Sequence, residues 1–409
     1  MARRKGETMN EQIKQRIIQL NNGEIPSGYE KTEFGIFPCD WVVDKRLKDV
    51  GTFGKGKGLP GDKMTLKGVP CVGYGDIYMK YNNFHFEKAK SFVDEETASE
   101  SQPIQKGTLL FTGTGETAEE IGKCVCYNGD ETIYAGGDII TFISNEVNPL
   151  FLAYQQYQGF SLRNKASFGQ GHSVVHIRQN NLEKLHVAYP KSADEQSKIA
   201  EILMKWDEMV ELQEQYIQKL EQREHSVVKT TINSVIGESK KIKECVSYHP
   251  SSLLIKNLKE EENGFPVYGA NDITMHISTY SFECNAVAII KYGSSAGRVS
   301  FLTGKHSVLG TMAEMLPKKN INIKYIYYVL KCFDFKRYIE ISTTPNVYFE
   351  DYAEEIIQVP NKNVQDRIVK ELDIFTEYIS LQKEKFERIK TQRKTLQQYL
   401  LNGIVRVEV

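Results

Sequence analysis

The stretch that decides the fold of this chain is Ala193–Leu220, ADEQSKIAEILMKWDEMVELQEQYIQKL. Its apolar residues recur at alternating steps of three and four, which is the spacing of a coiled-coil helix. A second stretch with the same pattern, Asn363–Ile389, reads NVQDRIVKELDIFTEYISLQKEKFERI. Each stretch follows a short strand-like segment that ends in proline, at Pro190 and Pro360. The sequence therefore predicts two long helices, over about 193–235 and 364–401, each placed after a β-rich region.

The two halves of the chain match each other at a constant offset. Gln196 aligns with Gln365, an offset of 169 residues, and this register holds along both predicted helices. It pairs Ile199 with Ile368, Leu203 with Leu372, Trp206 with Phe375, Leu212 with Leu381, Gln213 with Gln382, Lys219 with Arg388 and Asn233 with Asn402. We conclude that the chain is an internal repeat of a β region followed by a helix.

Runs such as GVPCVGYGDIYM at 68–79 look like strands and indicate β-rich regions, which match more loosely than the helices. PCVGYGDI at 70–77 resembles PVYGANDI at 266–273, and LLFTGTG at 109–115 resembles AIIKYGSSAG at 288–297. The ends of the chain also match, because QRIIQLNNGEI at 15–25 resembles QQYLLNGIV at 397–405. The order of elements therefore reads as a ring that has been cut within a helical element.

These patterns predict an α+β fold with two mostly-β domains in a pseudo-twofold relation, separated by two long antiparallel coiled-coil helices. We expect five segments: an N-terminal helix and lead-in over 1–35, a β domain over 36–190, a helix over 191–237, a second β domain over 238–360, and a helix with a C-terminal tail over 361–409.

Composition restricts the class of protein. The formal net charge is −1, so binding to nucleic acid would depend on local basic patches. No apolar run approaches the roughly 20 residues that span a bilayer, and the basic start is followed by a charged helical pattern, so we expect neither a membrane segment nor a signal peptide. Seven cysteines, an odd number, fit reduced thiols and a cytoplasmic location.

Two motifs resemble chemical sites. Gly51–Gly58, GTFGKGKG, has the spacing of a phosphate-binding loop up to Lys57, but Gly58 stands where that loop needs Ser or Thr for magnesium. His172 and His176 are four residues apart, which on a strand separates them by about 13 Å and disfavours a shared metal. We find neither a nucleophile elbow nor the motifs that would bind a methyl-donor cofactor or a flipped base, so we predict no catalytic residue and no metal site.

Several glycine-rich loops carry residues suited to recognition. GKGKG at 54–58, SFGQGHS at 167–173, KYGSSAGR at 291–298 and STTPN at 342–346 offer side chains that reach phosphates or read base edges. A solvated turn is the simpler interpretation of any one of these loops. Similar loops in both halves favour a role in recognition.

The helix starts YPKSADEQSKIAEIL and VPNKNVQDRIVKEL, the ending LLNGIVRV and the lead-in NNGEIPSGYEKTEFGIFPCDW resemble the specificity subunit of type I restriction–modification enzymes. The resemblance covers the whole chain and is strongest in the helices. It implies that each β domain is a target recognition domain for one half of a bipartite, asymmetric site in double-stranded DNA. It also implies that the helices set the spacer between the half-sites and dock two methyltransferase subunits.

The resemblance further implies a division of labour. Methyltransferase subunits would bring S-adenosylmethionine, and restriction or translocase subunits would bring ATP and magnesium, while this chain would bind no cofactor and no membrane. By residue type, we expect the DNA contacts to come from Lys55, Lys57, Tyr74, Thr112, Thr114, Gln170, His172, Tyr268, Asn271, Lys291, Tyr292, Ser294, Ser295, Arg298, Thr344 and Asn346.

Three alternatives stay open from the sequence. The chain could be the specificity subunit of a related restriction system with a different nuclease arrangement. It could instead be a coiled-coil scaffold that carries two carbohydrate- or protein-binding β domains, which the near-neutral charge permits. A standalone enzyme is disfavoured by the missing catalytic motifs.

Overall fold

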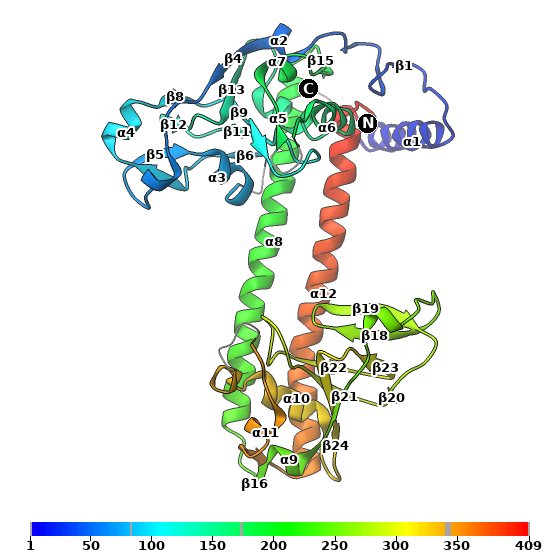
Figure 1. The fold of residues 1–409 in the computed structure, drawn as a ribbon. Helices are drawn as coiled ribbons and strands as arrows, with labels where there is room; N and C mark the ends of the chain where they lie inside the picture. The colour runs from blue at the N-terminus through cyan, green and yellow to red at the C-terminus, as the bar shows by residue number, and fades with distance from the viewer. Residues whose placement is uncertain (1, 82–83, 172–174, 340–344, 408–409) are drawn as a thin grey trace. The chain divides into compact units, whose positions relative to one another are not determined.

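A computed structural model describes residues 2–81, 84–171, 175–339 and 345–407, with side chains from Glu11 onward. The chain forms two compact units (Figure 1). Unit 1 comprises Met1–Leu212 and Glu387–Val409, and unit 2 comprises Gln213–Phe386. No helix among the described residues has both the length and the apolar character needed to cross a bilayer.

Regular structure in the first half of the chain consists of α1 (Ala2–Asn21), β1 (Tyr29–Lys31), β2 (Ile36–Pro38), β3 (Trp41–Val42), α2 (Leu47–Val50), β4 (Gly51–Lys55), η1 (Gly61–Lys63), β5 (Val69–Val72), α3 (Tyr74–Met79), β6 (His85–Phe86), β7 (Ser91–Val93), α4 (Glu95–Ser99), β8 (Gln102–Ile104), β9 (Thr108–Thr112), β10 (Thr114–Gly115), β11 (Cys124–Tyr127), β12 (Ile133–Ala135), β13 (Ile139–Ser144), α5 (Pro149–Gln155), α6 (Gly159–Phe168), β14 (Val175–His176), α7 (Gln179–Leu182), β15 (Tyr189–Pro190) and α8 (Ala193–Asn233).

The second half consists of β16 (Glu238–Lys241), α9 (Ile242–Cys245), β17 (Val246–Pro250), η2 (Ile255–Asn257), β18 (Phe265–Gly269), β19 (Asp272–Ile277), β20 (Phe282–Glu283), β21 (Ala286–Ile290), β22 (Val299–Leu302), β23 (Lys305–Val308), β24 (Met312–Pro317), α10 (Ile323–Lys331), η3 (Phe335–Tyr338), α11 (Phe349–Tyr352), β25 (Ile356–Val359) and α12 (Lys362–Leu401).

The two long helices are confirmed, and each contributes a segment to both units. α8 has 41 residues and α12 has 40. In unit 1, Ile199 and Leu203 of α8 share a buried core with Leu400 and Leu401 of α12. In unit 2, Val228 of α8 is buried in the cluster that holds the first turns of α12. The helix segments therefore run antiparallel within each unit, and the apolar residues near the ends of both helices pack into the two cores.

The β regions of the two units share one topology, apart from an additional strand, β6, at the edge of one sheet in unit 1. One sheet has the order β4-β13-β9-β11-β6 in unit 1 and β17-β24-β21-β22 in unit 2. The other has the order β7-β5-β12-β8 in unit 1 and β19-β18-β23-β20 in unit 2. In both of these smaller sheets the central pair is parallel and the outer pairs are antiparallel. The internal repeat thus extends through the β regions, although the sequences there have diverged.

One local prediction was wrong. The run GVPCVGYGDIYM was expected to be a strand, but only Val69–Val72 is extended and Tyr74–Met79 is helix α3. The carboxylate of Asp76 accepts the backbone N–H of Gly73 at 2.9 Å. This contact caps the short helix, and such caps stabilise a helical turn where a run of apolar residues suggests a strand.

The glutamine shared by the two helix starts anchors each helix to its β region. In unit 1, Gln196 accepts the backbone N–H of Asn148 at 2.7 Å and donates to the carbonyl of Pro190 at 2.8 Å. In unit 2, Gln365 accepts the N–H of Asn322 at 2.8 Å and donates to Pro360 at 2.8 Å. Asn148 and Asn322 are the N-caps of α5 and α10, so one amide ties two helices and a strand together.

Within unit 2 the helices meet at a glutamine pair. Gln213 donates to Gln382 at 3.1 Å, and these residues, 169 apart, are each other's counterparts in the repeat. A twofold relation between two copies brings equivalent residues into contact with each other. A polar pair at a coiled-coil core position also fixes the register of the helices.

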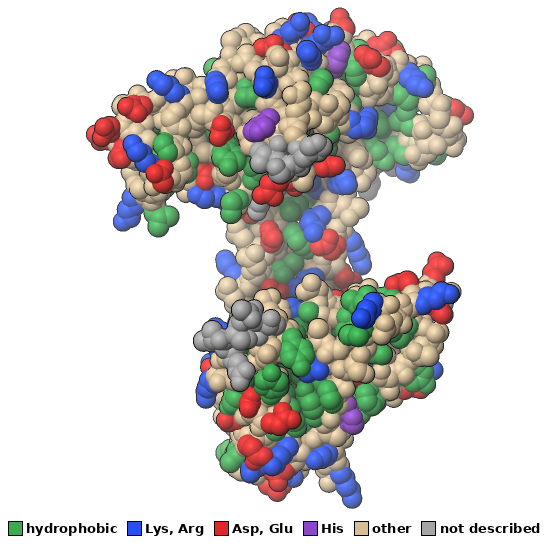
Figure 2. Space-filling model, viewed as in Figure 1, with side chains coloured by type: hydrophobic (Ala, Val, Ile, Leu, Met, Phe, Trp, Pro, Cys, Tyr) green, Lys and Arg blue, Asp and Glu red, His purple; other side chains and the backbone are tan. Residues whose placement is uncertain are grey.

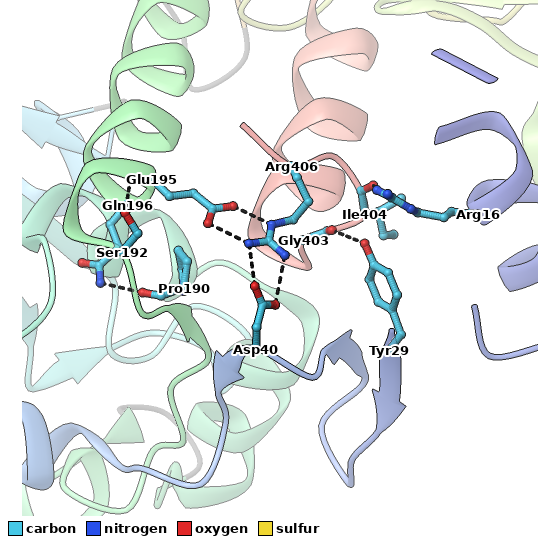
Figure 3. A network of polar contacts seen from close by, with 10 residues as sticks. All are labelled: Arg16, Tyr29, Asp40, Pro190, Ser192, Glu195, Gln196, Gly403, Ile404 and Arg406. Atoms are coloured by element: carbon cyan, nitrogen blue, oxygen red, sulfur yellow. Dashed lines mark hydrogen bonds and ion pairs between the residues drawn. The ribbon is translucent and has the colours of Figure 1, made fainter. Parts of the chain in front are cut away.

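The tail after α12 is fastened to the lead-in of unit 1 (Figure 3). Arg406 forms ion pairs with Glu195 at 2.6 Å and with Asp40 at 3.0 Å, and Tyr29 donates to the carbonyl of Gly403 at 2.5 Å. β3 then pairs with β15, as β16 pairs with β25 in unit 2. The ends of the chain therefore meet in unit 1, in agreement with a ring-like order of elements.

Candidate nucleic-acid interface

Each unit presents one pair of loops at an equivalent place in its topology. We define the loop pair of unit 1 as residues 113–115 with 175–178, and the loop pair of unit 2 as residues 291–293 with 345–348. They are joined by bridges between Thr114 and His176 in unit 1 and between Tyr292 and Asn346 in unit 2.

The backbone hydrogen bonds of the two loop pairs also correspond. The N–H of Gly113 donates to Asp138 at 2.9 Å, and that of Lys291 donates to Thr311 at 2.8 Å. Ile177 donates to Gly113 at 3.0 Å, and Val347 donates to Lys291 at 2.9 Å. The loops that the sequence matched only weakly are therefore held by the same backbone frame.

A cavity of about 520 Å³ opens beside the loop pair of unit 1. Three of the predicted residues, Lys55, Thr114 and Gln170, line it together. Its other polar lining includes His176, Arg178, Gln179, Asn181 and Asp138. Donors outnumber carboxylates in this cavity, which suits the acceptor-rich edges and phosphates of DNA.

Residues His176, Arg178 and Asn181 were missed by the sequence analysis. Thr114 Oγ1 lies 3.3 Å from His176 Nδ1, and the side chain of Asn181 accepts the backbone N–H of Arg178 at 3.2 Å. The polar run HIRQNN, which begins at the second residue of β14, was the available signal, but only the fold shows that His176 pairs with Thr114.

A second cavity in unit 1, of about 720 Å³, holds Tyr74, which was predicted to contact DNA. Tyr78 and Tyr157 line it as well, and its other lining includes the glutamates Glu116, Glu119 and Glu120. These three carboxylates outnumber the two lysines of the lining, Lys123 and Lys165, and carboxylates repel phosphates, so this cavity is less suited to the DNA backbone than the first. Thr114 lines both cavities, whereas Tyr74 lines only the second, and Lys55 and Gln170 line only the first.

The prediction that Thr112 contacts DNA was wrong. Its side chain is fully buried, and its hydroxyl lies 2.8 Å from the hydroxyl of Tyr78. Thr112 ends β9, the central strand of the larger sheet, where all five side chains are buried. In this conformation it supports Tyr78 and is not available to a ligand.

In unit 2 the predicted residues Lys291, Tyr292, Ser294, Ser295 and Arg298 form the loop between β21 and β22. The ammonium of Lys291 lies 5.2 Å from the centroid of the Tyr292 ring, and partial burial lowers the pKa of Lys291. Asn346 forms an antiparallel bridge with Tyr292 of this loop, and its side-chain amide donates to the hydroxyl of Tyr348 at 3.4 Å. Tyr292 and Tyr348 are each about 40% exposed, so aromatic faces are open to a ligand here.

The remaining predicted residues are dispersed. Tyr268 is half-buried against the cluster that includes Ile290 and Met312, and Asn271 is exposed in the turn between β18 and β19. Lys57 is exposed in the loop after β4. His172 and Thr344 lie outside the described residues.

The phosphate-loop interpretation of Gly51–Gly58 is excluded by the backbone. Gly51–Lys55 is strand β4, and the N–H groups of Gly56 and Lys57 donate to the carbonyls of Ile139 and Ala135. Those N–H groups are therefore not turned toward a phosphate. Within the described ranges, no group of three or more His, Cys, Asp or Glu is arranged to hold a metal ion.

Basic and acidic side chains are interspersed on the face of both units in Figure 2. The formal net charge of −1 means that the chain as a whole carries no excess of positive charge. Attraction to phosphates therefore depends on local groups of basic residues rather than on the charge of the whole chain.

Lys165, which lines a cavity together with Thr114 and Gly115 of the loop pair, should make the stability of unit 1 depend on pH. Lys165 is fully buried, donates to the carbonyl of Gly122 at 3.0 Å, and lies 5.3 Å from the ring centroid of Tyr157. Burial lowers the pKa of Lys165 from 10.5 to about 8, so between these values the unfolded state binds more protons than the native state.

The contribution of Lys165 to the stability of unit 1 should therefore rise between pH 8 and pH 10.5, by on the order of 3 kcal/mol. Lys165→Met should abolish this rise. Urea unfolding of both proteins at pH 8 and pH 10, followed by the fluorescence of Trp41 and Trp206 in unit 1, measures the difference. Parallel pH dependences in the two proteins would contradict the prediction.

Comparison with known proteins identifies the class. The family model described as "Type I restriction modification DNA specificity domain" matches residues 38–222 and again residues 237–391. The chain therefore belongs to the family of type I restriction–modification DNA specificity domains, and it carries two copies.

Solved structures agree with this assignment. The fold resembles the type I restriction–modification S subunit from M. genitalium, with a TM-score of 0.57 and 18% identity over 88% of this chain and 96% of that one. It also resembles a chain from a structure described as "Structural basis underlying complex assembly and conformational transition of the type I R-M system", with a TM-score of 0.59 and 14% identity over 90% and 99% of the two chains. At these identities the likeness establishes the fold.

Proposed function

We propose that this chain is the DNA-reading subunit of a type I restriction–modification complex and that each unit recognises one half of a bipartite, asymmetric site. The observation that carries this proposal is the loop pair, which recurs in both units on the same backbone frame but with different side chains. Two equivalent readers with different surfaces fit a site made of two different half-sites.

The helices support a role in setting the spacer. At 1.5 Å per residue, α8 and α12 are each about 60 Å long. Two readers separated by one turn of DNA need about 34 Å between their centres, so a helical pair of this length is sufficient. The glutamine pair and the ion pair between Glu221 and Lys383 at 2.6 Å fix the helix register in unit 2.

The helices also carry apolar side chains that the chain itself leaves exposed. In unit 2, Ile374, Tyr378 and Leu381 follow one face of α12, with Ile374 and Leu381 about 60% exposed. In unit 1, Met209 and Leu212 are exposed on α8. Exposed apolar residues at helical spacing are suited to docking other helices, and we assign these surfaces to the two methyltransferase subunits.

The chemistry is then supplied by other subunits. Methyltransferase subunits would use S-adenosylmethionine, and restriction or translocase subunits would use ATP and magnesium, in the cytoplasm. The present chain would contribute sequence selection and geometry, without catalytic residues of its own.

Binding-site selection tests the proposal directly. The chain, purified with its methyltransferase partner, is incubated with a library of random-sequence DNA duplexes, and the bound fraction is sequenced. Two short conserved elements separated by a fixed spacer are expected. A single contiguous element, or no enrichment, would contradict the proposal and favour a scaffold with β domains that bind other ligands.

A prediction on affinity concerns the loop between β21 and β22. Changing Lys291 and Arg298 together to Ala should weaken DNA binding and reduce the slope of log K against log salt by about 0.9 for each phosphate that the variant no longer neutralises. Titrations across a range of salt concentrations measure this slope. Unchanged affinity at low salt would remove both residues from the set that touches DNA.

A further inference from the structure

The two loop pairs differ in chemistry at several aligned positions, three of which carry a polar side chain in both units. The shared frame aligns Thr114 with Tyr292, His176 with Asn346, and Arg178 with Tyr348. The frame also keeps one glycine in common, Gly115 with Gly293. A constant backbone with variable side chains is the arrangement expected of positions that set specificity.

The alignment of Arg178 with Tyr348 has independent support. Arg178 is the N-cap of α7 and Tyr348 is the N-cap of α11. Leu185 lies three residues after the end of α7, and its carbonyl accepts the N–H of the first residue of α2. Glu355 lies three residues after the end of α11, and its carbonyl accepts the N–H of the first residue of α9. The two positions are therefore equivalent in sequence order, in helix position and in hydrogen bonding.

The chemistry at Arg178 points to one base. Arg178 is exposed and lines the 520 Å³ cavity beside Gln170 and His176. A guanidinium presents a planar fork of donors that matches O6 and N7 of guanine in the major groove, and this is the commonest specific contact of a side chain with a base. Tyr348, its counterpart, has a single hydroxyl and cannot make this bidentate contact.

We infer, on the basis of the proposed function, that the three aligned pairs of positions determine specificity and that Arg178 requires a guanine at one position of the half-site read by unit 1. The loop pair of unit 2 has two exposed tyrosines and Asn346, and it has no guanidinium at the position aligned with Arg178. The two half-sites therefore differ in composition because the same frame carries different side chains.

Substitution of Arg178 should preserve folding. Its capping contact uses its backbone N–H, which Asn181 accepts, so Arg178→Tyr and Arg178→Lys leave the cap intact. Arg178→Tyr introduces the residue found at the counterpart position, and Arg178→Lys keeps the charge but removes the fork. Arg163, exposed on α6 in the same unit, provides a matched control as Arg163→Ala.

Binding-site selection with the chain and its methyltransferase partner is then repeated for the four proteins. For the wild type we expect a preference for guanine of roughly 5- to 150-fold at one position of one half-site. Arg178→Tyr should reduce it to about 2-fold or less, and Arg178→Lys should reduce it less far, because the ammonium can still donate to the guanine acceptors. Both variants should leave every other position and the second half-site unchanged. Arg163→Ala should give the wild-type motif.

Three results would overturn the inference. The motif could be unchanged in both Arg178 variants, or DNA affinity could fall equally on all sequences with a smaller salt slope, which indicates a phosphate contact. The third is the same loss of guanine preference in Arg163→Ala. Unfolding of one Arg178 variant would appear in the tryptophan fluorescence of unit 1, and the other variant then decides the outcome. The absence of any bipartite motif in the wild type would contradict the proposed function itself, which is a separate result.

Discussion

Inserting four helix-forming residues after both Leu212 and Leu381 should lengthen the spacer of the recognised site and leave both half-sites unchanged. These two positions are counterparts in the repeat, so matched insertions extend α8 and α12 together. Four residues add about 6 Å at 1.5 Å per residue, close to two base-pair steps of about 3.4 Å. Four residues also make slightly more than one helical turn, so the apolar stripes stay nearly in phase.

The measurement is the recognised motif, obtained by sequencing methylated sites in cells that express each variant. We expect the wild-type half-sites separated by about one or two additional base pairs. A matched control inserts the same four residues after Gly304, in the exposed turn between β22 and β23, and should leave the spacer unchanged. An unchanged spacer in the doubly extended protein would exclude the helices as the determinant of spacing.

Gly403→Ala should destabilise unit 1 by about 2–5 kcal/mol, more than the same change at Gly23. Both glycines follow an asparagine after a helix and both have positive φ, +66° at Gly403 and +78° at Gly23. A Cβ on Gly403 would lie 2.5 Å from Cγ of Pro38 and 3.1 Å from the ring of Trp41, whereas a Cβ on Gly23 would meet no atom within 4 Å. Gly23→Ala therefore lowers the free energy of unfolding by only about 1–2 kcal/mol, because alanine is strained at positive φ. Gly403→Ala adds the cost of overpacking against Pro38 and Trp41.

Urea unfolding followed by tryptophan fluorescence compares the two variants, because Trp41 and Trp206 both lie in unit 1. The clash in Gly403→Ala would separate the tail from the lead-in, and with it the contacts of Arg406 and Tyr29 (Figure 3). Equal destabilisation by the two changes would show that the tail does not hold the lead-in in place.

The helices could be predicted from the sequence because their determinants are local. Ile199, Leu203 and their counterparts recur at helical spacing, and the start of each helix repeats a glutamine at a fixed distance from a proline. The structure supplies the reason for that glutamine, which holds the N-cap asparagine of a helix some 45 residues earlier in sequence.

The surface of the loops could be predicted only in part. Lys55, Thr114 and Gln170 were recognised by type, and the fold brings them to one cavity. Thr112 is two residues from Thr114, but it ends β9, a central strand whose side chains are buried on both faces. The residue pattern TGTG does not show which threonine reaches the surface.

Arg178 could not be predicted because its role depends on a long-range pairing. Nothing in HIRQNN marks it as a partner of a loop more than 60 residues earlier. The bridge between Thr114 and His176 makes that connection, and the equivalent bridge in unit 2 shows that it belongs to the shared frame.

The central claim is that two equivalent readers in one chain select a bipartite site for methylation. Sequencing of methylated adenines across the genome, in cells with and without this chain, tests it most directly. We predict one motif of two different half-sites with a fixed spacer that is methylated only when the chain is present. A set of methylated motifs that is identical in the two cell types would contradict the claim.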